Sequence, residues 1–145
     1  MKHSVRFRTG LPLLLLVLLF SACSSTREVS DWHDFRNYPL RDVLAEDEGV
    51  ASYYHNKFHG RRTANGERYD RTQLTAAHRE FPFGSWLRIV SLENGNEVIV
   101  RVNDRGPFVR SRVIDLSRAA AEQLDMLHDG LMRVRVEVLA WGGQE

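Results

Sequence analysis

The chain has 145 residues and a formal net charge of +1, with 43% hydrophobic and 27% charged residues. Lys2, Arg6 and Arg8 precede the apolar run at the amino terminus; leaving out these three of the 20 basic residues, and none of the 19 acidic ones, gives 17 against 19, a net charge of −2. That balance offers no electrostatic basis for nucleic-acid binding, and the about 120 residues that remain suffice for one modest core.

Residues 1–22 have the pattern of a lipoprotein signal peptide. A basic start is followed by LPLLLLVLLF, Leu11 to Phe20, and then by two small residues. The run is shorter than the about 20 residues that span a bilayer. Cys23 is the only cysteine and has no disulfide partner, and its surroundings resemble a lipobox, although Phe20 stands where leucine is usual. We therefore expect a lipid anchor at Cys23, and Ser24 favours the outer membrane, facing the periplasm.

The following residues divide into a tether and a single domain. Residues 23–48 are polar and aperiodic, which predicts a tether, and residues 49–141 contain the strand patterns, with a tail at 142–145. Strands are predicted, in chain order, over GVASYY (49–54), TAAH (75–78), WLRIVSL (86–92), EVIVRV (97–102), RVIDL (112–116) and MRVRVEVL (132–139). The sequence predicts a mostly β fold, a small six-stranded barrel with one or two short helices.

Turn and helix signals connect these strands. Asn94-Gly95 predicts a hairpin with a type I′ turn between the third and fourth strands. Ser117 is a suitable N-cap for an alanine-rich helix over 117–126. The stretch HNKFHGRRTANGERYD, residues 55–70, predicts a long ordered loop, and loops of this length in small domains are usually functional. VNDRGPF, Val102 to Phe108, ends a strand abruptly and predicts an acidic side chain fixed at the rim of the barrel.

Four motifs in one order give the chain a family resemblance. TANGE (63–67), YD (69–70), TAAH and VNDRGPF, together with the lipobox, closely resemble the rare lipoprotein A family and its double-psi β-barrel. The resemblance covers about residues 49–126 and the last strand, but not the C-terminal repeat domain that many members carry. It implies a periplasmic lipoprotein that acts on peptidoglycan glycan strands, in some members as a lytic transglycosylase, and a fold shared with expansins.

The resemblance carries the family's functional residues onto Glu67, His78 and Asp104. A lytic transglycosylase needs one acid/base, because the 6-hydroxyl of the sugar replaces water as the nucleophile, whereas ordinary glycosidases use two carboxylates. We expect Asp104 to be that group, protonated near neutral pH. Glu67 either raises the proton affinity of Asp104 through its charge or orients the substrate. His78 either bonds Asp104 or the sugar, or is a core histidine.

The remaining candidates are weighed against structural roles. Substrate-binding candidates are Tyr54, Thr63, Asn65, Asn103 and Arg105, although an arginine in such a loop often braces carbonyl groups. Four aromatic residues, Tyr53, Tyr54, Phe58 and Trp86, are candidates for stacking on sugars or for the core. Asp115 is expected to anchor the helix that follows it. His55 and His59 lack a metal-binding pattern, and no cofactor is expected.

Two functions remain open from the sequence. The first is a lytic transglycosylase that cleaves between N-acetylmuramic acid and N-acetylglucosamine. The second is a non-catalytic, expansin-like peptidoglycan-binding lipoprotein of the cell envelope or of cell division, whose division partners the sequence does not identify. In both, the expected partners are peptidoglycan glycan strands and, through the lipid, the membrane.

Overall fold

The computed structural model describes residues 43–143. The predicted signal peptide, Cys23, the tether as far as residue 42 and the last two residues of the tail lie outside this range. Within the range, none of the helices has the length and apolar character needed to cross a membrane. The elements are β1 (Ala45–Tyr53), the 3-10 helix η3 (Asn56–Phe58), β2 (Thr75–Ala77), β3 (Trp86–Ser91), β4 (Glu97–Asp104), β5 (Arg112–Leu116), α1 (Arg118–Gln123) and β6 (Met132–Ala140).

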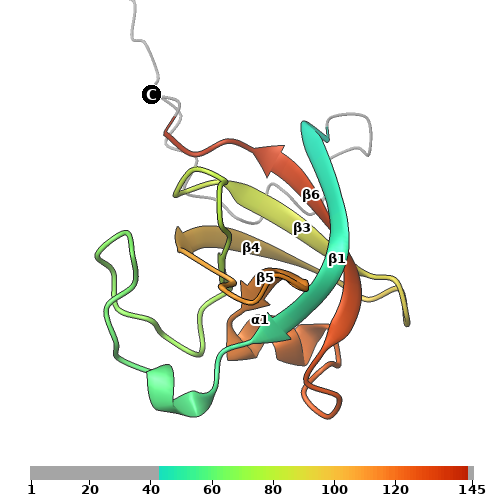
Figure 1. Ribbon diagram of the computed structural model, residues 1–145, viewed down its shortest axis with the longest axis horizontal. Helices are drawn as coiled ribbons and strands as arrows, with labels where there is room; N and C mark the ends of the chain where they lie inside the picture. The colour runs from blue at the N-terminus through green and yellow to red at the C-terminus, as the bar shows by residue number, and fades with distance from the viewer. Residues whose placement is uncertain (1–42, 144–145) are drawn as a thin grey trace, which may run out of the picture. The chain divides into compact units, whose positions relative to one another are not determined.

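The strands form a closed barrel in the order β1-β5-β2-β4-β3-β6 (Figure 1). Two neighbouring pairs are parallel, β1 with β5 and β2 with β4, and the other four are antiparallel. The expectation of a mostly β, six-stranded barrel with short helices is thus confirmed. The parallel pairs have a functional consequence, since they bring the ends of strands that are distant in the sequence to the same rim.

Alternating side chains fill the barrel. In β6, Val134, Val136 and Val138 are fully buried, as the alternation in the sequence predicts. Valines of β4 and aliphatic residues of β3 and β5 meet them in one core cluster. Leu124 and Met126, which follow α1, are also fully buried in this cluster. The core therefore holds the rims of the barrel in place.

β1 begins at Ala45, four residues before the predicted start of the domain at Gly49. Ala45 pairs with Val138 and Glu46 with Glu137 on β6. The acidic run predicts a solvated tether, but backbone pairing with β6 extends the strand through it. Arg135 on β6 also stabilises the extension, since its Nε lies 3.0 Å from Glu46 and 3.1 Å from Glu48 carboxylate oxygens.

The hairpin between β3 and β4 is confirmed, but the type I′ turn is wrong. A type I′ turn needs positive φ at both central residues, and of Asn94 and Gly95 only Gly95 has it, at 76°. The loop is longer, because the Ser91 amide donates to the Asn96 carbonyl across it. Ser91 Oγ accepts from the amides of Glu93 and Asn94, both at 3.2 Å, and this side chain holds the alternative turn.

The helix is confirmed in place and is shorter than predicted. Ser117 is the N-cap, and its Oγ accepts from the Ala120 amide at 3.2 Å. α1 ends at Gln123 rather than at Met126, because Asp125 has a φ of 59°, outside the right-handed helical region.

One ion pair lies buried on the outside of the barrel. Arg88 is the partner of Glu137 in the β3–β6 register and points away from the core, between the inward-facing Leu87 and Ile89. Its Nε and Nη2 lie 2.6 and 2.5 Å from the same oxygen of Glu137. The side chains are only 9% and 7% exposed, although alternation predicts that Glu137 faces solvent. Burial of the pair makes each charge dependent on the other.

Candidate functional site

A groove of about 550 Å³ lies at the rim where β1, β4 and β5 end. The long loop between β1 and β2, coloured green in Figure 1, supplies much of its lining. Its lining combines two carboxylates with aromatic, hydroxyl and basic side chains: Ser52, Tyr53, Tyr54, His55, Phe58, Arg61, Arg62, Thr63, Ala64, Tyr69, Asp104, Arg105, Phe108, Arg112 and Asp115. The predicted candidates Tyr54, Thr63, Asp104 and Arg105 therefore share one groove.

The Asp104 carboxyl group is held by three donors from three segments of the chain. Its Oδ1 accepts from the amides of Ala64 and Arg105, each at 2.8 Å. Its Oδ2 accepts from the Tyr54 hydroxyl at 2.6 Å. Its backbone carbonyl accepts from the His78 amide at 3.2 Å. Both donors on Oδ1 are therefore backbone amides, and the donor on Oδ2 is a side-chain hydroxyl.

Tyr54 supports Asp104 from the end of β1. Burial, and then its hydrogen bond to Asp104, raise the pKa of the Tyr54 hydroxyl far above its usual value. The hydroxyl therefore keeps its proton and acts as a donor. The ring packs against Tyr69 at 4.7 Å and against Phe58 at 5.8 Å between centroids. Tyr54, a substrate-binding candidate from the sequence, thus lines the groove, and its hydroxyl donates its hydrogen bond to Asp104.

Glu67 belongs to a separate network on the outer side of β4. Its two oxygens accept from Arg101 Nη1 and Nη2 at 2.8 and 2.9 Å. Asn103 Nδ2 and Asn65 Nδ2 donate to the same carboxylate at 3.0 and 2.9 Å. The hydrogen bonds from Arg101 lower the pKa of Glu67 to about 2, although partial burial of the carboxylate acts in the opposite direction. Because Arg101 neutralises the Glu67 carboxylate, this charge is not free to raise the proton affinity of Asp104.

The Glu67 network aligns the loop with Asp104. The Asn65 amide donates to the Asn103 carbonyl at 3.3 Å, and Thr63 Oγ1 donates to Asn65 Oδ1 at 2.7 Å. These bonds fix the TANGE segment on β4 and leave the Ala64 amide pointing at Asp104. Thr63, Asn65 and Asn103 therefore have most of their polar groups engaged within the protein, and the geometry gives them a positioning role.

His78 lies next to Asp104 in the backbone but its ring is bound elsewhere. Nδ1 accepts from the amides of Glu80 and Phe81 at 3.2 and 3.0 Å, and the ring stacks on Phe81 at 3.6 Å. Among the described residues no hydrogen bond joins its imidazole to Asp104. Burial lowers the pKa of the ring, which favours a neutral imidazole that shapes the turn after β2.

Arg105 braces the rim. Its Nη1 donates to the carbonyls of His78 and Phe81 at 3.2 and 3.0 Å. Its guanidinium also lies 3.7 Å from the centre of the Phe83 ring. The sequence allows two roles for Arg105, bracing carbonyl groups or contacting substrate. The structure shows the first, and Arg105 also lines the groove.

Asp115 is a groove residue that the sequence analysis assigned elsewhere. It does not cap α1, since Ser117 does so. Its Oδ1 accepts from Ser52 Oγ at 2.5 Å, and Arg112 Nη1 donates to the same hydroxyl at 2.8 Å. Ser52 and Asp115 are partners in the parallel β1–β5 register. Only this pairing, which local patterns do not reveal, would have placed the second carboxylate in the groove.

Comparison with known families identifies the fold. Residues 46–136 match the family model DPBB_1, described as "Lytic transglycolase". The chain belongs to this family. The predicted double-psi β-barrel and the resemblance to rare lipoprotein A are both confirmed.

Two bacterial relatives show how far the similarity extends. The endolytic peptidoglycan transglycosylase RlpA of Campylobacter jejuni is 50% identical over 106 residues, 72% of this chain and 38% of the relative. That of Pseudomonas aeruginosa, strain UCBPP-PA14, is 54% identical over 101 residues, 69% of this chain and 30% of the relative. The chain spans less than half the length of these curated relatives.

Solved structures with lower identity share the fold. The Streptomyces papain inhibitor has a TM-score of 0.56 at 23% identity, over 68% of this chain and 97% of the inhibitor. A mutant Clavibacter michiganensis expansin, solved in complex with cellohexaose, has a TM-score of 0.54 at 15% identity, over 66% of this chain and 51% of the expansin. These two matches show that the fold of this chain is shared with both proteins.

The Glu67 network makes a prediction about stability and pH. We expect Glu67→Gln to lower the free energy of unfolding by about 1 kcal/mol at pH 7, a modest value because the side chain is 41% exposed and water screens the pair. The pKa is lowered from 4.5 to about 2 in the folded state. The contribution is therefore complete above pH 4.5 and is lost as the pH falls towards 2.

Urea unfolding of the wild type and of Glu67→Gln between pH 2 and 7 measures the difference in their free energies of unfolding. This difference should become smaller as the pH falls. Glu122→Gln, on the exposed side of α1, should have the stability of the wild type at every pH. A difference that stays constant with pH would show that Glu67 acts through packing rather than charge.

Proposed function

We propose that the chain is a lytic transglycosylase that cleaves peptidoglycan glycan strands between N-acetylmuramic acid and N-acetylglucosamine. The observation that carries this proposal is the Asp104 carboxyl group, fixed at the rim of an open groove by Tyr54, Ala64 and Arg105. The names of the RlpA relatives, which share this barrel at about half identity, support the substrate.

The chemistry requires two proton transfers at one oxygen. Asp104 Oδ2 gives its proton to the glycosidic oxygen as the bond from C1 of the muramyl sugar breaks. The 6-hydroxyl of the same sugar then attacks C1, and its proton passes to the Asp104 carboxylate. One bond breaks, one forms, the acid is restored and no water is added, so the product has a 1,6-anhydro end.

In this proposed scheme the supporting residues have distinct tasks. Tyr54 and the two backbone amides keep the carboxyl group in one orientation, which contributes to catalysis by limiting motion of the reacting group. Glu67 acts through Asn65 and Asn103 on the position of the Ala64 amide. It is a positioning residue, not a second acid.

Digestion of purified sacculi and of peptide-free glycan strands tests the proposal. We expect mass spectrometry to detect muropeptides or glycans with 1,6-anhydro ends from at least one of the two substrates. Reducing ends formed by hydrolysis would contradict the transglycosylase reaction. Binding to both substrates without any cleavage would favour the expansin-like glycan binder instead.

We also propose that Cys23 carries the lipid that holds the protein in the outer membrane, facing the periplasm. The support is the lipobox-like sequence at the end of the apolar run. Changing Cys23→Ser should move the protein from the membrane fraction to another fraction of the cell and prevent palmitate labelling. Unchanged labelling would show that the lipid is attached elsewhere or by another route.

A further inference from the structure

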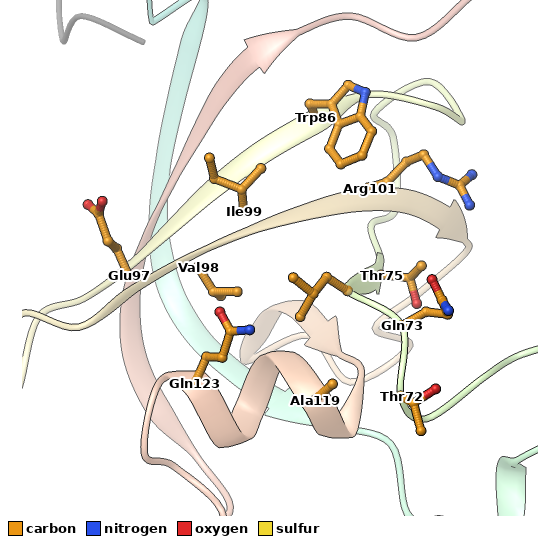
Figure 2. Close-up of a pocket in the computed structure, with 11 residues that line it drawn as sticks. Thr72, Gln73, Thr75, Trp86, Glu97, Val98, Ile99, Arg101, Ala119 and Gln123 are labelled. Carbon is orange, nitrogen blue, oxygen red and sulfur yellow. The ribbon is translucent and has the colours of Figure 1, made fainter. Parts of the chain in front are cut away.

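A second and larger groove, of about 870 Å³, runs along β4 away from the Asp104 rim. Figure 2 shows α1 on one side of it, with Ala119 and Gln123 on the face of the helix towards β4, and the segment before β2 at one end. Its lining is Thr72, Gln73, Leu74, Thr75, Trp86, Glu97, Val98, Ile99, Arg101, Ala119 and Gln123. Of the functional candidates from the sequence, Trp86 lines this groove, whereas Glu67, His78 and Asp104 do not.

The amide side chains of this groove have unused hydrogen-bonding groups. Within residues 43–143, no hydrogen bond joins the side-chain amide of Gln73 or Gln123 to another residue, and both side chains are exposed. In contrast, the amides of Asn65 and Asn103 are engaged with Glu67. Each glutamine offers a donor and an acceptor, which matches the hydroxyl and acetamido groups of amino sugars.

The charge and the apolar surface of the groove also suit a sugar. Its two charged residues are Glu97 and Arg101, and Arg101 is already paired with Glu67. The groove therefore has no surplus positive charge, which favours uncharged amino-sugar units over groups that carry a carboxylate. Trp86 and Ile99 are half-buried on the outer face of the β3–β4 pair and supply apolar surface to the lining of the groove.

Arg101 connects this groove to the Asp104 groove. It lines the larger groove and holds Glu67, whose network positions the loop on Asp104. Arg101 and Asp104 are three residues apart on β4, which corresponds to about 10 Å along a strand. Because side chains three residues apart on a strand point to opposite faces, a glycan strand that fills both grooves has to cross the Glu67–Arg101 pair, whose side chains are 41% and 31% exposed.

We propose that the larger groove binds amino-sugar units of the same glycan strand that lie beyond the cleaved bond. Gln73 and Gln123 recognise acetamido and hydroxyl groups, and Trp86 supports a ring. This inference rests on the proposed function for its substrate, and it makes a separate claim, namely that affinity increases with glycan length because a second groove is filled.

Binding, rather than cleavage, tests the inference. The purified protein carrying Asp104→Asn is titrated with peptide-free glycan oligomers of two to ten sugars by calorimetry, with and without the pair of changes Gln73→Ala and Gln123→Ala. Because a hydrogen bond contributes modestly, we expect the two changes to weaken binding of the longest oligomers about tenfold and to leave the shortest unaffected. Glu122→Ala, on α1 but outside the groove, is the matched control and should bind like the parent.

A second readout locates the ligand. In NMR spectra the side-chain amide signals of Gln73 and Gln123 should shift with long oligomers and stay in place with disaccharides. Equal affinity of parent and double variant at every length, or shifts produced by a stem peptide and not by glycan, would overturn the inference. Length-dependent binding in a protein that yields no anhydro products would instead remove the transglycosylase proposal and leave the second groove standing.

Discussion

Replacing Asp104 by asparagine is expected to lower the rate of 1,6-anhydro product formation by about 10²–10⁴-fold, the usual contribution of a general acid/base. The asparagine oxygen can still accept from the Ala64 and Arg105 amides, so the rim should keep its shape. What disappears is the proposed acid/base, since an amide neither donates a proton to the leaving oxygen nor accepts one from the 6-hydroxyl. The initial rate of product release from peptide-free strands, followed by mass spectrometry, measures the loss.

Two comparisons make this result specific. Asp129→Asn is the matched control, because Asp129 is exposed and its carboxylate lies 3.4 Å from the ring of its neighbour His128; this variant should retain full activity. The circular dichroism spectrum and glycan affinity of the Asp104→Asn protein should equal those of the wild type. Product formation that persists in Asp104→Asn would remove Asp104 from the role of acid and leave the enzyme itself in place.

Breaking the ion pair on the outside of the barrel is expected to have the largest effect on stability. Arg88→Met leaves the Glu137 carboxylate buried without its partner, and removing one member of a buried pair typically costs about 3–5 kcal/mol. Domains of this size have a free energy of unfolding of only about 5–15 kcal/mol. We therefore expect a large fall in the urea midpoint of unfolding.

The double variant Arg88→Met with Glu137→Leu distinguishes charge from packing. Since apolar residues of similar size often replace a buried pair without loss, the double variant should recover most of the lost stability. Arg133→Met, on an exposed position of β6, should behave like the wild type. A single variant that loses less than about 1 kcal/mol would show that water reaches Glu137 and relieves its charge.

Local patterns in the sequence predict the strands because each carries its own period. Val134, Val136 and Val138 alternate and are all inward, and Ser117 caps its helix as its residue type favours. The start of β1 at Ala45 is not local, since it depends on a partner strand that lies at the other end of the domain. The burial of Glu137 has the same origin, because only the β3–β6 register places Arg88 beside it.

The candidate site likewise has features that the local sequence predicts and features that depend on contacts between distant segments. VNDRGPF predicts a carboxylate at a rim, and the structure places Asp104 there, but its donors Tyr54 and Ala64 come from another part of the chain. Arg101, which neutralises Glu67, lies outside the TANGE, YD, TAAH and VNDRGPF motifs. The sequence predicts Asp115 to be a helix anchor, whereas its pairing with Ser52 depends on two parallel strands. Contacts between distant segments are what a pattern along one chain does not encode.

The pairing of β1 has a consequence for the order in which the chain folds. β1 is the first strand of the domain, and both of its neighbours, β5 and β6, are among the last elements (Figure 1). A growing or translocating chain therefore cannot satisfy the backbone of β1 until nearly the whole domain has emerged. Such non-local topologies fold slowly and expose unpaired strands on the way. We therefore expect the Asp104 rim, which needs β1, β4 and the loop between β1 and β2 together, to form only once β5 and β6 have paired with β1.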